Sequence, residues 1–317
     1  MPDLRQLRAL QAVAEAGSFS GAAYALDYTQ PAISKSIATL ERELGAVLVE
    51  RECRPVRLTD AGAALVRHAD EVFAQLSSAK SEIEAITQAE AGTVAVGTFG
   101  SAAAAFVVDA LCEFRKRHPG VHVSIAEGMP SALVRRLRAG ELDLAVVFDF
   151  PDTGEDIGEG LELQPLLDQP FDIVLHLRHP QAHEKRVRPA DLANDDWVLQ
   201  DFGPESPTLK LIGRMCAASG YEPRVAFRVN DCQVILAMVA AGEGVSILPR
   251  LMLDPLHADV AVRPVEGDAP VQRVAAVRLP TRHLAPAAAG FLSALQDAAK
   301  RRVDSWTHWG GISAGKR

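Results

Sequence analysis

The sequence predicts a multidomain protein with an all-α N-terminal domain, a long linker helix and a C-terminal α/β domain of two lobes. Apolar residues recur at helical spacing over the first part of the chain, a heptad-like repeat follows, and short apolar runs then alternate with helical segments. A chain of 317 residues also exceeds the size that one hydrophobic core usually supports. The expected boundaries are 1–59 for the N-terminal domain, 60–90 for the linker helix, 91–303 for the α/β domain (lobes of about 91–165 with 270–303, and 166–269) and 304–317 for a disordered tail.

The composition predicts a globular cytoplasmic protein with no membrane association. Hydrophobic residues make up 48% and charged residues 23% of the chain. No apolar run approaches the roughly 18 to 20 residues that a membrane span needs. The segment that starts at Met1 also lacks the basic and apolar stretches of a secretory signal.

Helical periodicity predicts three short helices near the N-terminus. The first covers about residues 3–16 and ends at Gly17. The second begins after Ser18, and its small residues permit close packing by a neighbouring helix. The third follows a turn, starts after Thr29 as a suitable N-cap, and lasts to about residue 44.

The third predicted helix has a polar outward face of the kind that reads a DNA groove. Its apolar residues recur at intervals of four, three and four, and form one stripe of Ile33, Ile37, Leu40 and Leu44. Residues 46–58 then contain two β-like runs around a charged tip, which is the outline of a wing. Together these elements predict a winged helix-turn-helix that binds double-stranded DNA.

Candidate DNA contacts lie at the start of the third helix, on the helix before it and in the wing. They are Ser20, Gln30, Pro31, Ser34, Lys35, Ser36, Arg51 and Arg54. Gln30 can pair with adenine through two hydrogen bonds, Pro31 can touch a thymine methyl, and Lys35 can reach guanine or phosphate. Ser20 and Ser36 can donate to phosphates, and the wing arginines are available to phosphates or the minor groove. Outside this turn context, the helix serines would be interpreted as ordinary surface residues.

The overall charge does not mark the chain as a DNA-binding protein. The formal net charge is -8, and residues 1–59 contain seven Lys or Arg against seven Asp or Glu. DNA affinity must therefore depend on where a few cations and polar donors are placed.

A fourth, long helix is predicted from Thr59 to about Gln88. Its apolar residues alternate spacings of four and three, as is typical of a coiled coil. They are Leu65, Ala69, Val72, Leu76, Ala79, Ile83 and Ile86. The alternative is a helix packed on its own domain, but a helix this long with a charged opposite side would be hard to bury alone. We therefore expect a homodimer.

Beyond residue 91 the pattern alternates between strand and helix, which favours a mainly parallel sheet. The expected strands are 94–97, 121–125, 142–148, 171–175, 197–199, 224–229, 245–248 and 271–279. One expected helix ends near 116, and the others cover 131–139, 208–218, 231–241 and about 286–301. The last strand and helix are expected to return to the first lobe.

Motifs for catalysis, cofactors and metals are missing from the sequence. It contains no Gly-x-Ser-x-Gly elbow, P-loop or dinucleotide fingerprint. His179 and His183 have the spacing of a zinc pair, but Pro180 lies between them and no flanking Glu completes the motif, so surface histidines are favoured. Cys216 and Cys232 could form a redox pair, or could be small apolar side chains or free thiols. We expect neither an enzyme nor a cofactor.

Residues 3–62 resemble the LysR-type transcriptional regulators almost without a gap. The resemblance is carried by Leu7 with Leu10, Gly17-Ser-Phe-Ser, Ala22-Ala, Gln30-Pro-Ala-Ile-Ser-Lys-Ser-Ile, Leu40-Glu-Arg-Glu-Leu-Gly, Leu48-Val-Glu-Arg, Arg54-Pro-Val-Arg-Leu-Thr and Ala61-Gly. Segments 127–131, 138–145 and 239–249 are similar to the family's effector domain, although that match is less specific.

The resemblance implies a transcription regulator that binds an interrupted inverted repeat. It implies a homodimer through the linker helix, commonly assembled into a homotetramer, and a C-terminal domain like a periplasmic binding protein. It also places Arg54 at the wing tip, in a minor groove. Contact with RNA polymerase is a further expectation. Pro130 stands where the family usually has a Ser or Thr that bonds the effector, so Ser131 or a different effector has to be considered.

The effector is expected near the carboxyl ends of the strands, where ligands of such α/β domains gather. Thr98-Phe-Gly-Ser follows the first strand and opens a helix, whose backbone N–H groups would suit an anionic small molecule. The candidate effector contacts are Thr98, Phe99, Gly100, Ser101, Ser131, Phe148, Phe202 and Asn230.

Two other functions stay open at this point. The α/β half could be a solute-binding module whose N-terminal segment serves only assembly, although an export signal would then be expected. The chain could also be an architectural DNA protein without an effector, which would not need two lobes with a cleft. The effector, the target genes, and activation as opposed to repression are not readable from the sequence.

Overall fold

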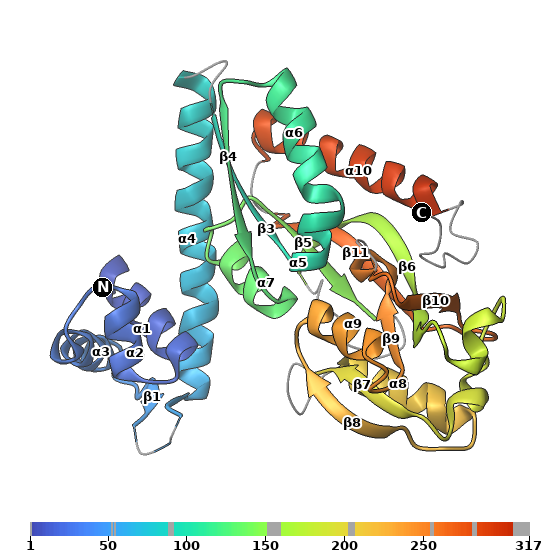
Figure 1. The fold of residues 1–317 in the computed structure, drawn as a ribbon. Coiled ribbons are helices and arrows are strands. Elements are labelled where there is room, and N and C mark those ends of the chain that lie inside the picture. The colour runs from blue at the N-terminus through green and yellow to red at the C-terminus, as the bar shows by residue number, and fades with distance from the viewer. Residues whose placement is uncertain are drawn as a thin grey trace. The chain divides into compact units, whose positions relative to one another are not determined.

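The computed structural model describes residues 2–51, 53, 55–87, 92–150, 160–201, 207–253, 257–280 and 284–306 (Figure 1). The chain divides into two compact units. One contains the residues up to Glu84, and the other contains most of the residues from Ala85 onward. Residues 304–306 of the predicted disordered tail are the end of a helix that covers Pro286–Trp306, and the rest of the predicted tail lies outside the described residues.

The N-terminal unit consists of helices and a short ribbon that follow the predicted order. Its elements are α1 (Leu4–Ala16), α2 (Phe19–Ala25), α3 (Gln30–Leu44), β1 (Val49–Glu50), β2 (Arg57–Leu58) and α4 (Asp60–Thr87). The side chains of Asp3, Ser18 and Thr29 accept hydrogen bonds from the first turns of α1, α2 and α3. α1 and α3 end at Gly17 and Gly45, which adopt φ values of 60° and 65°. The predicted helix boundaries are confirmed to within a residue.

The core of this unit lies between α1, α2, α3 and the base of the ribbon. Leu10, Val13, Ile37 and Leu40 are completely buried. The predicted stripe on α3 is therefore correct except at its end, where Leu44 is 42% exposed. The core cluster on α3 stops at Leu40, so the last turn before the terminating glycine extends beyond it.

The C-terminal unit alternates strands with helices over most of its length. Its elements are β3 (Gly92–Thr98), α5 (Gly100–Ala102), the π-helical turn η1 (Ala103–Val107), α6 (Val108–Arg117), β4 (Val121–Glu127), α7 (Pro130–Arg138), β5 (Leu144–Asp149), β6 (Glu162–His176), η3 (Pro180–His183), η4 (Pro189–Leu192), β7 (Asp196–Gln200), α8 (Pro207–Ala218), β8 (Arg224–Val229), α9 (Cys232–Ala240), β9 (Ser246–Pro249), η5 (Arg250–Met252), β10 (Val260–Pro264), β11 (Val271–Arg278) and α10 (Pro286–Trp306).

The large sheet of this unit is mixed, so the expectation of a mainly parallel sheet is wrong. Its strand order is β10-β6-β11-β5-β3-β4, with β9 also paired to β6. β3 is parallel to β4 and β5, whereas β11 is antiparallel to β5 and β6, and β9 and β10 are antiparallel to β6. β10 and β11, which only six residues join, pair antiparallel with successive parts of β6, so the parallel crossover pattern of β3, β4 and β5 does not continue. β7 and β8 form a separate parallel pair.

Strand β6 runs continuously from the first lobe into the second. Residues 162–170 pair with β11, and residues 171–176 pair with β9 or β10. The sequence predicted only the apolar second half, because Pro165, Pro170 and several polar residues make the first half unlike a strand. A register shift between Val274 and Ala275 of β11, opposite Pro165 and Leu167, accommodates the irregular part.

Two layers of helices cover the sheet of the first lobe. Leu144 and Val146 of β5 join the core cluster with α6 and α10, whereas Ala145 and Val147 join the cluster with α7 (Figure 1). The alternation of buried side chains along β5 thus places one helical layer on each face of the sheet. In the second lobe, Ile173 and Val174 of β6 likewise enter different clusters, Val174 beside α9.

Candidate DNA interface and ligand cleft

The start of α3 exposes most of the residues predicted to contact DNA. Gln30, Pro31 and Lys35 are exposed, and Ser34 and Ser36 are partly exposed. Residues four apart lie on one side of a helix, so Gln30 lies above Ser34, and Pro31 lies above Lys35. Ser20 is exposed on α2, the first helix of the turn.

Two exposed tyrosines border the same turn and were not predicted. Tyr24 is 93% exposed on α2, and Tyr28 is 54% exposed immediately before the N-cap of α3. Aromatic side chains outside the apolar stripe, next to a turn, were the signal that could have identified them. A tyrosine hydroxyl can donate to a phosphate oxygen, so both belong to the candidate interface.

Arg51 is held against its own domain. Its Nη2 lies 2.8 Å from Glu41 Oε2, and its guanidinium lies 5.5 Å from the ring centroid of Phe19. Glu41 Oε1 accepts from the backbone N–H of Leu48 at 2.9 Å and of Val49 at 3.4 Å. One carboxylate of α3 therefore binds the strand that leads into the wing. The other predicted wing residue, Arg54, lies outside the described residues.

The wing is anchored at both of its ends. Val56 N donates to Gly17 O at 2.8 Å, and Thr59 Oγ1 donates to Val47 O at 2.7 Å. Thr59 also caps α4, because its Oγ1 accepts from Gly62 N at 3.1 Å. A Cβ on Gly62 would lie 2.1 Å from the carbonyl oxygen of Leu48, so this contact requires glycine.

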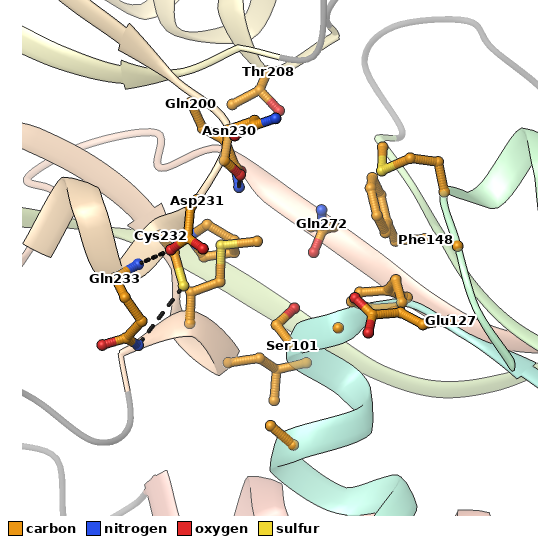
Figure 2. Close-up of a pocket in the computed structure, with 18 of the residues that line it drawn as sticks. Ser101, Glu127, Phe148, Gln200, Thr208, Asn230, Asp231, Cys232, Gln233 and Gln272 are labelled. Carbon is orange, nitrogen blue, oxygen red and sulfur yellow. Dashed lines mark hydrogen bonds between the residues drawn. The ribbon is translucent and has the colours of Figure 1, made fainter. Parts of the chain in front are cut away.

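A cavity of about 500 Å³ opens in the C-terminal unit at the ends of several strands (Figure 2). It is lined by Phe99, Gly100, Ser101, Ala104, Glu127, Gly128, Met129, Phe148, Phe171, Gln200, Thr208, Asn230, Asp231, Cys232, Gln233, Pro249, Leu251, Met252 and Gln272. The volume lies within the range of small-molecule sites. Both lobes contribute, since β4 and β5 belong to the first and β7, β8 and α9 to the second.

Five of the eight predicted effector contacts line this cavity. They are Phe99, Gly100, Ser101, Phe148 and Asn230. Thr98 and Ser131 do not line it: Thr98 is buried and donates to Phe99 O at 3.3 Å, and Ser131 is exposed in the first turn of α7. Phe202 lies outside the described residues.

The polar residues of the cavity were mostly missed by the sequence. Glu127 ends β4, Gln200 ends β7, and Asp231 precedes α9 (Figure 2). All three lie at or just beyond strand ends, where the same rule predicted Phe148, Phe202 and Asn230. Thr208 and Gln272 carried no comparable signal, because their positions depend on α8 and β11 folding back onto the cavity.

A chain of hydrogen bonds sets the orientation of Gln272. Leu251 N donates to Gln169 Oε1 at 2.8 Å, so the remaining polar atom of the Gln169 side chain is its amide nitrogen, Nε2, which is a donor. Gln169 Nε2 donates to Gln272 Oε1 at 2.6 Å. Gln272 is 3% exposed, and its Nε2 has no partner among the described residues. An unpaired donor therefore lines the cavity.

The charges that line the cavity are negative. Glu127 and Asp231 are carboxylates, and the described lining residues include no Lys, Arg or His. Asp231 Oδ1 caps α9 by accepting from Gln233 N at 2.7 Å and Val234 N at 3.3 Å. Burial, and then the charge of Asp231, raise the pKa of the Cys232 thiol.

The described residues offer little for redox, metal or membrane chemistry. Cys216 and Cys232 are free, and burial raises the pKa of both thiols. His179 accepts from Gln181 N at 3.2 Å and lies 3.2 Å from Asp195. Within the described ranges, no group of His, Cys, Asp and Glu could hold a metal ion. No described helix is long and apolar enough to span a bilayer.

Family models match both parts of the chain. Residues 4–63 match the bacterial regulatory helix-turn-helix protein model of the lysR family, and residues 87–300 match the LysR substrate binding domain. The transcriptional dual regulator GltC of Bacillus subtilis is 31% identical over 291 residues, which cover 91% of this chain and 95% of GltC. The probable regulator LrrA of Synechococcus elongatus is 30% identical, covering 94% of this chain and 97% of LrrA.

Solved structures share the fold. HinK of Pseudomonas aeruginosa, a LysR family transcriptional regulator, is 26% identical with a TM-score of 0.58, covering 94% of this chain and 99% of its own. An OxyR C206 mutant of Corynebacterium glutamicum is 25% identical with a TM-score of 0.59, covering 98% and 95%. Full-length CbnR, solved in complex with its target DNA, is 24% identical with a TM-score of 0.57 and is similar in fold, covering 93% and 99%.

Proposed function

Because the chain belongs to the LysR family of transcription regulators, we propose that the exposed start of α3 reads operator DNA and that the cavity holds the effector. The chain is a DNA-binding regulator of transcription with a domain for a small-molecule effector, and its relatives form a non-enzymatic family. The observation that carries the proposal is the polar, exposed face of α3, formed by Gln30, Ser34 and Lys35, on a helix whose opposite side is buried.

The DNA contacts divide into base readers and phosphate contacts. Gln30 and Lys35 extend from the first turns of α3, where a recognition helix meets base edges in the major groove. Ser20, Ser36 and Tyr28 are placed to donate to phosphates. Arg51 contributes less in this scheme, because Glu41 already neutralises its charge.

A homodimer would present two recognition helices to the two halves of an interrupted inverted repeat. α4 supports this proposal, because apolar side chains on its heptad positions are exposed in the single chain: Val72 by 42%, Leu76 by 50% and Ile83 by 61%. Such a stripe on a long helix matches a coiled-coil seam. Assembly into a tetramer and contact with RNA polymerase stay predictions.

The effector part of the proposal rests on the cavity. It is a concave, largely apolar space with a few buried polar groups, and it lies within the segment matched by the substrate binding domain model. Regulation would follow if the ligand binds one arrangement of the lobes more tightly than another. The lining gives no support to the anionic effector expected from the sequence, because no cation is found among its described residues.

Footprinting on the DNA upstream of the chain's own gene tests the DNA part. The full-length protein is expected to protect an interrupted inverted repeat, and Gln30→Ala is expected to relax specificity at one base pair by about 1 to 3 kcal/mol. Lys35→Ala should weaken binding and, if it contacts phosphate, reduce the slope of log K against log salt by about one.

Lys300→Ala is the matched control for lost charge, since Lys300 is an exposed lysine on α10. It should leave the footprint and the salt slope unchanged. Equal binding by the wild type and a Gln30→Ala, Ser34→Ala, Lys35→Ala triple variant would refute the assignment of α3 as the reading helix.

A further inference from the structure

The protein's own carboxylates lie at two helix starts that line the cavity. Asp231 caps α9 through two backbone N–H groups. Glu127 Oε1 lies only 2.7 Å from the point that a Cβ on Gly100 would occupy, so its carboxylate lies against the first residue of the helical run from Gly100 to Arg117. An external anion at either helix start would therefore meet a carboxylate of the chain itself.

The cavity keeps a negative balance after this compensation. Each helix N-terminus carries roughly half a positive charge, whereas each carboxylate carries a full negative one. The described lining supplies no cationic side chain, and residues 202–206, which follow β7 and read Phe-Gly-Pro-Glu-Ser, contain none in their sequence. A further carboxylate brought in by a ligand would therefore meet two like charges and no cationic side chain of the described lining.

Aromatic rings line the cavity, among them Phe148, which Figure 2 labels. Phe99 and Phe148 both line it, and their rings meet edge to face at a centroid distance of 4.8 Å and an angle of 79°. Phe171 lines the cavity as well, and Phe150 links it to Phe148 through ring distances of 6.1 and 5.7 Å. The face of an aromatic ring and a carboxylate both attract an organic cation, so a lining of rings and carboxylates favours that class of ligand.

One further group can donate a hydrogen bond to an acceptor on the ligand. Gln272 is only 3% exposed, and its unpaired Nε2 can only donate. A ligand oxygen that accepts from this donor would gain a hydrogen bond at the wall of the cavity. Ser101 Oγ is also buried without a partner among the described residues, and it lies on the same side as Glu127 (Figure 2).

We propose that the cavity binds an organic cation: an ammonium group beside Glu127, an aromatic or apolar body against Phe99 and Phe148, and an oxygen acceptor at Gln272. This inference rests on the proposed function of the cavity as the effector site and names the chemical class of its ligand.

Three probes of matched size, with a phenyl ring and a hydroxyl in common, test the charge class. They are phenylalaninol, which carries an ammonium group, 3-phenyllactate, which carries a carboxylate, and neutral 3-phenylpropane-1,2-diol. Titration calorimetry and thermal shift on the full-length protein should show phenylalaninol as the tightest binder. Glu127→Gln should weaken it about tenfold or more and leave the neutral diol unchanged, because only the charged contact is lost.

Two further variants separate the inference from the function on which it rests. Glu222→Gln removes an exposed carboxylate outside the cavity and should change nothing. Ala104→Trp fills the cavity from η1 and should abolish binding of any ligand held there.

If phenyllactate binds best and Ala104→Trp abolishes its binding, the cavity is the effector site and the cationic class is wrong. Equal phenylalaninol affinity in wild type and Glu127→Gln, or no binding at millimolar concentration, also overturns the inference. If Ala104→Trp leaves every bound probe unaffected, the cavity itself is not the site, and the effector proposal fails with the inference.

Discussion

Glu41 and Arg51 form an ion pair at 2.8 Å that joins the recognition helix to the start of the wing. The glutamate is the less exposed partner, at 16% against 44% for the arginine. The other carboxylate oxygen of Glu41 accepts from two backbone N–H groups of the wing strand. Glu41 therefore fixes the position of that strand in addition to pairing with Arg51. Arg51 is therefore bound within its domain, which the sequence could not show.

Glu41→Ala should destabilise the N-terminal unit by about 1 to 3 kcal/mol, because the N–H groups of Leu48 and Val49 lose their acceptor. Glu41→Gln keeps an oxygen in place and should cost less. Urea unfolding followed by circular dichroism measures both. A Glu41→Ala protein as stable as the wild type would show that these hydrogen bonds contribute nothing net.

Gly62→Ala should strongly destabilise the contact between α4 and the wing. The added Cβ would lie 2.1 Å from Leu48 O, and a backbone atom cannot rotate away. Gly213→Ala on α8 is the matched control, since its Cβ would meet nothing within 4 Å and alanine favours a helix by about 1 kcal/mol. Melting temperatures of the two variants should thus move in opposite directions.

Asp172→Asn should be among the most damaging single changes in the C-terminal unit. Asp172 is 1% exposed, and both its oxygens accept from Arg250, at 2.7 and 2.8 Å. Removing one charge of a buried pair leaves the other uncompensated, which costs about 3 to 5 kcal/mol. Arg273→Gln, which breaks the more exposed pair with Asp149, should cost within about 1 kcal/mol. Similar unfolding free energies for both variants would contradict this ranking.

Asp70→Asn should stabilise the N-terminal unit at neutral pH. Burial raises the pKa of Asp70 above its ordinary 3.8, although the hydrogen bond from Gln11 opposes this shift. The folded state therefore binds the proton more tightly than the unfolded state does. The free energy of unfolding falls as pH rises from 3.8 through the raised pKa, and remains lower above it.

The asparagine removes that penalty and still accepts from Gln11, so its advantage should shrink as pH falls toward 3.8. Thermal unfolding from acidic to neutral pH measures the difference. Asp297→Asn, at an exposed site on α10, is the control for replacing a carboxylate. A constant difference across the range for Asp70→Asn would exclude titration of this carboxyl as the cause.

Leu76→Glu should convert the proposed dimer into monomers. Leu76 is 50% exposed in the single chain, and a coiled-coil seam would bury the introduced carboxylate among apolar side chains of the partner helix. Arg67→Glu lies on the opposite side of α4 and should leave the assembly intact. Sedimentation equilibrium distinguishes the two, and a Leu76→Glu protein that remains dimeric would place the dimer interface elsewhere.

Local rules were enough for the N-terminal unit. The caps Ser18 and Thr29 and the terminators Gly17 and Gly45 act within one or two turns of their own position, so they can be read in order along the chain. Sheet pairing depends on contacts between distant segments, and this is why the mixed sheet and the first half of β6 were not predicted.

The sequence by itself determined the order of elements, the helix boundaries, the exposed face of α3 and the family. Those features depend on spacing and on short-range hydrogen bonds. Only the tertiary structure decided the character of the cavity, because Glu127, Asp231 and Gln272 come from separate elements of the fold. The helix start at Gly100 was predicted to attract an anion, but it lies beside the carboxylate of Glu127, because β4 ends next to it. Electrostatic preference at a site depends on every charge within a few ångströms, and sequence separation does not measure that distance.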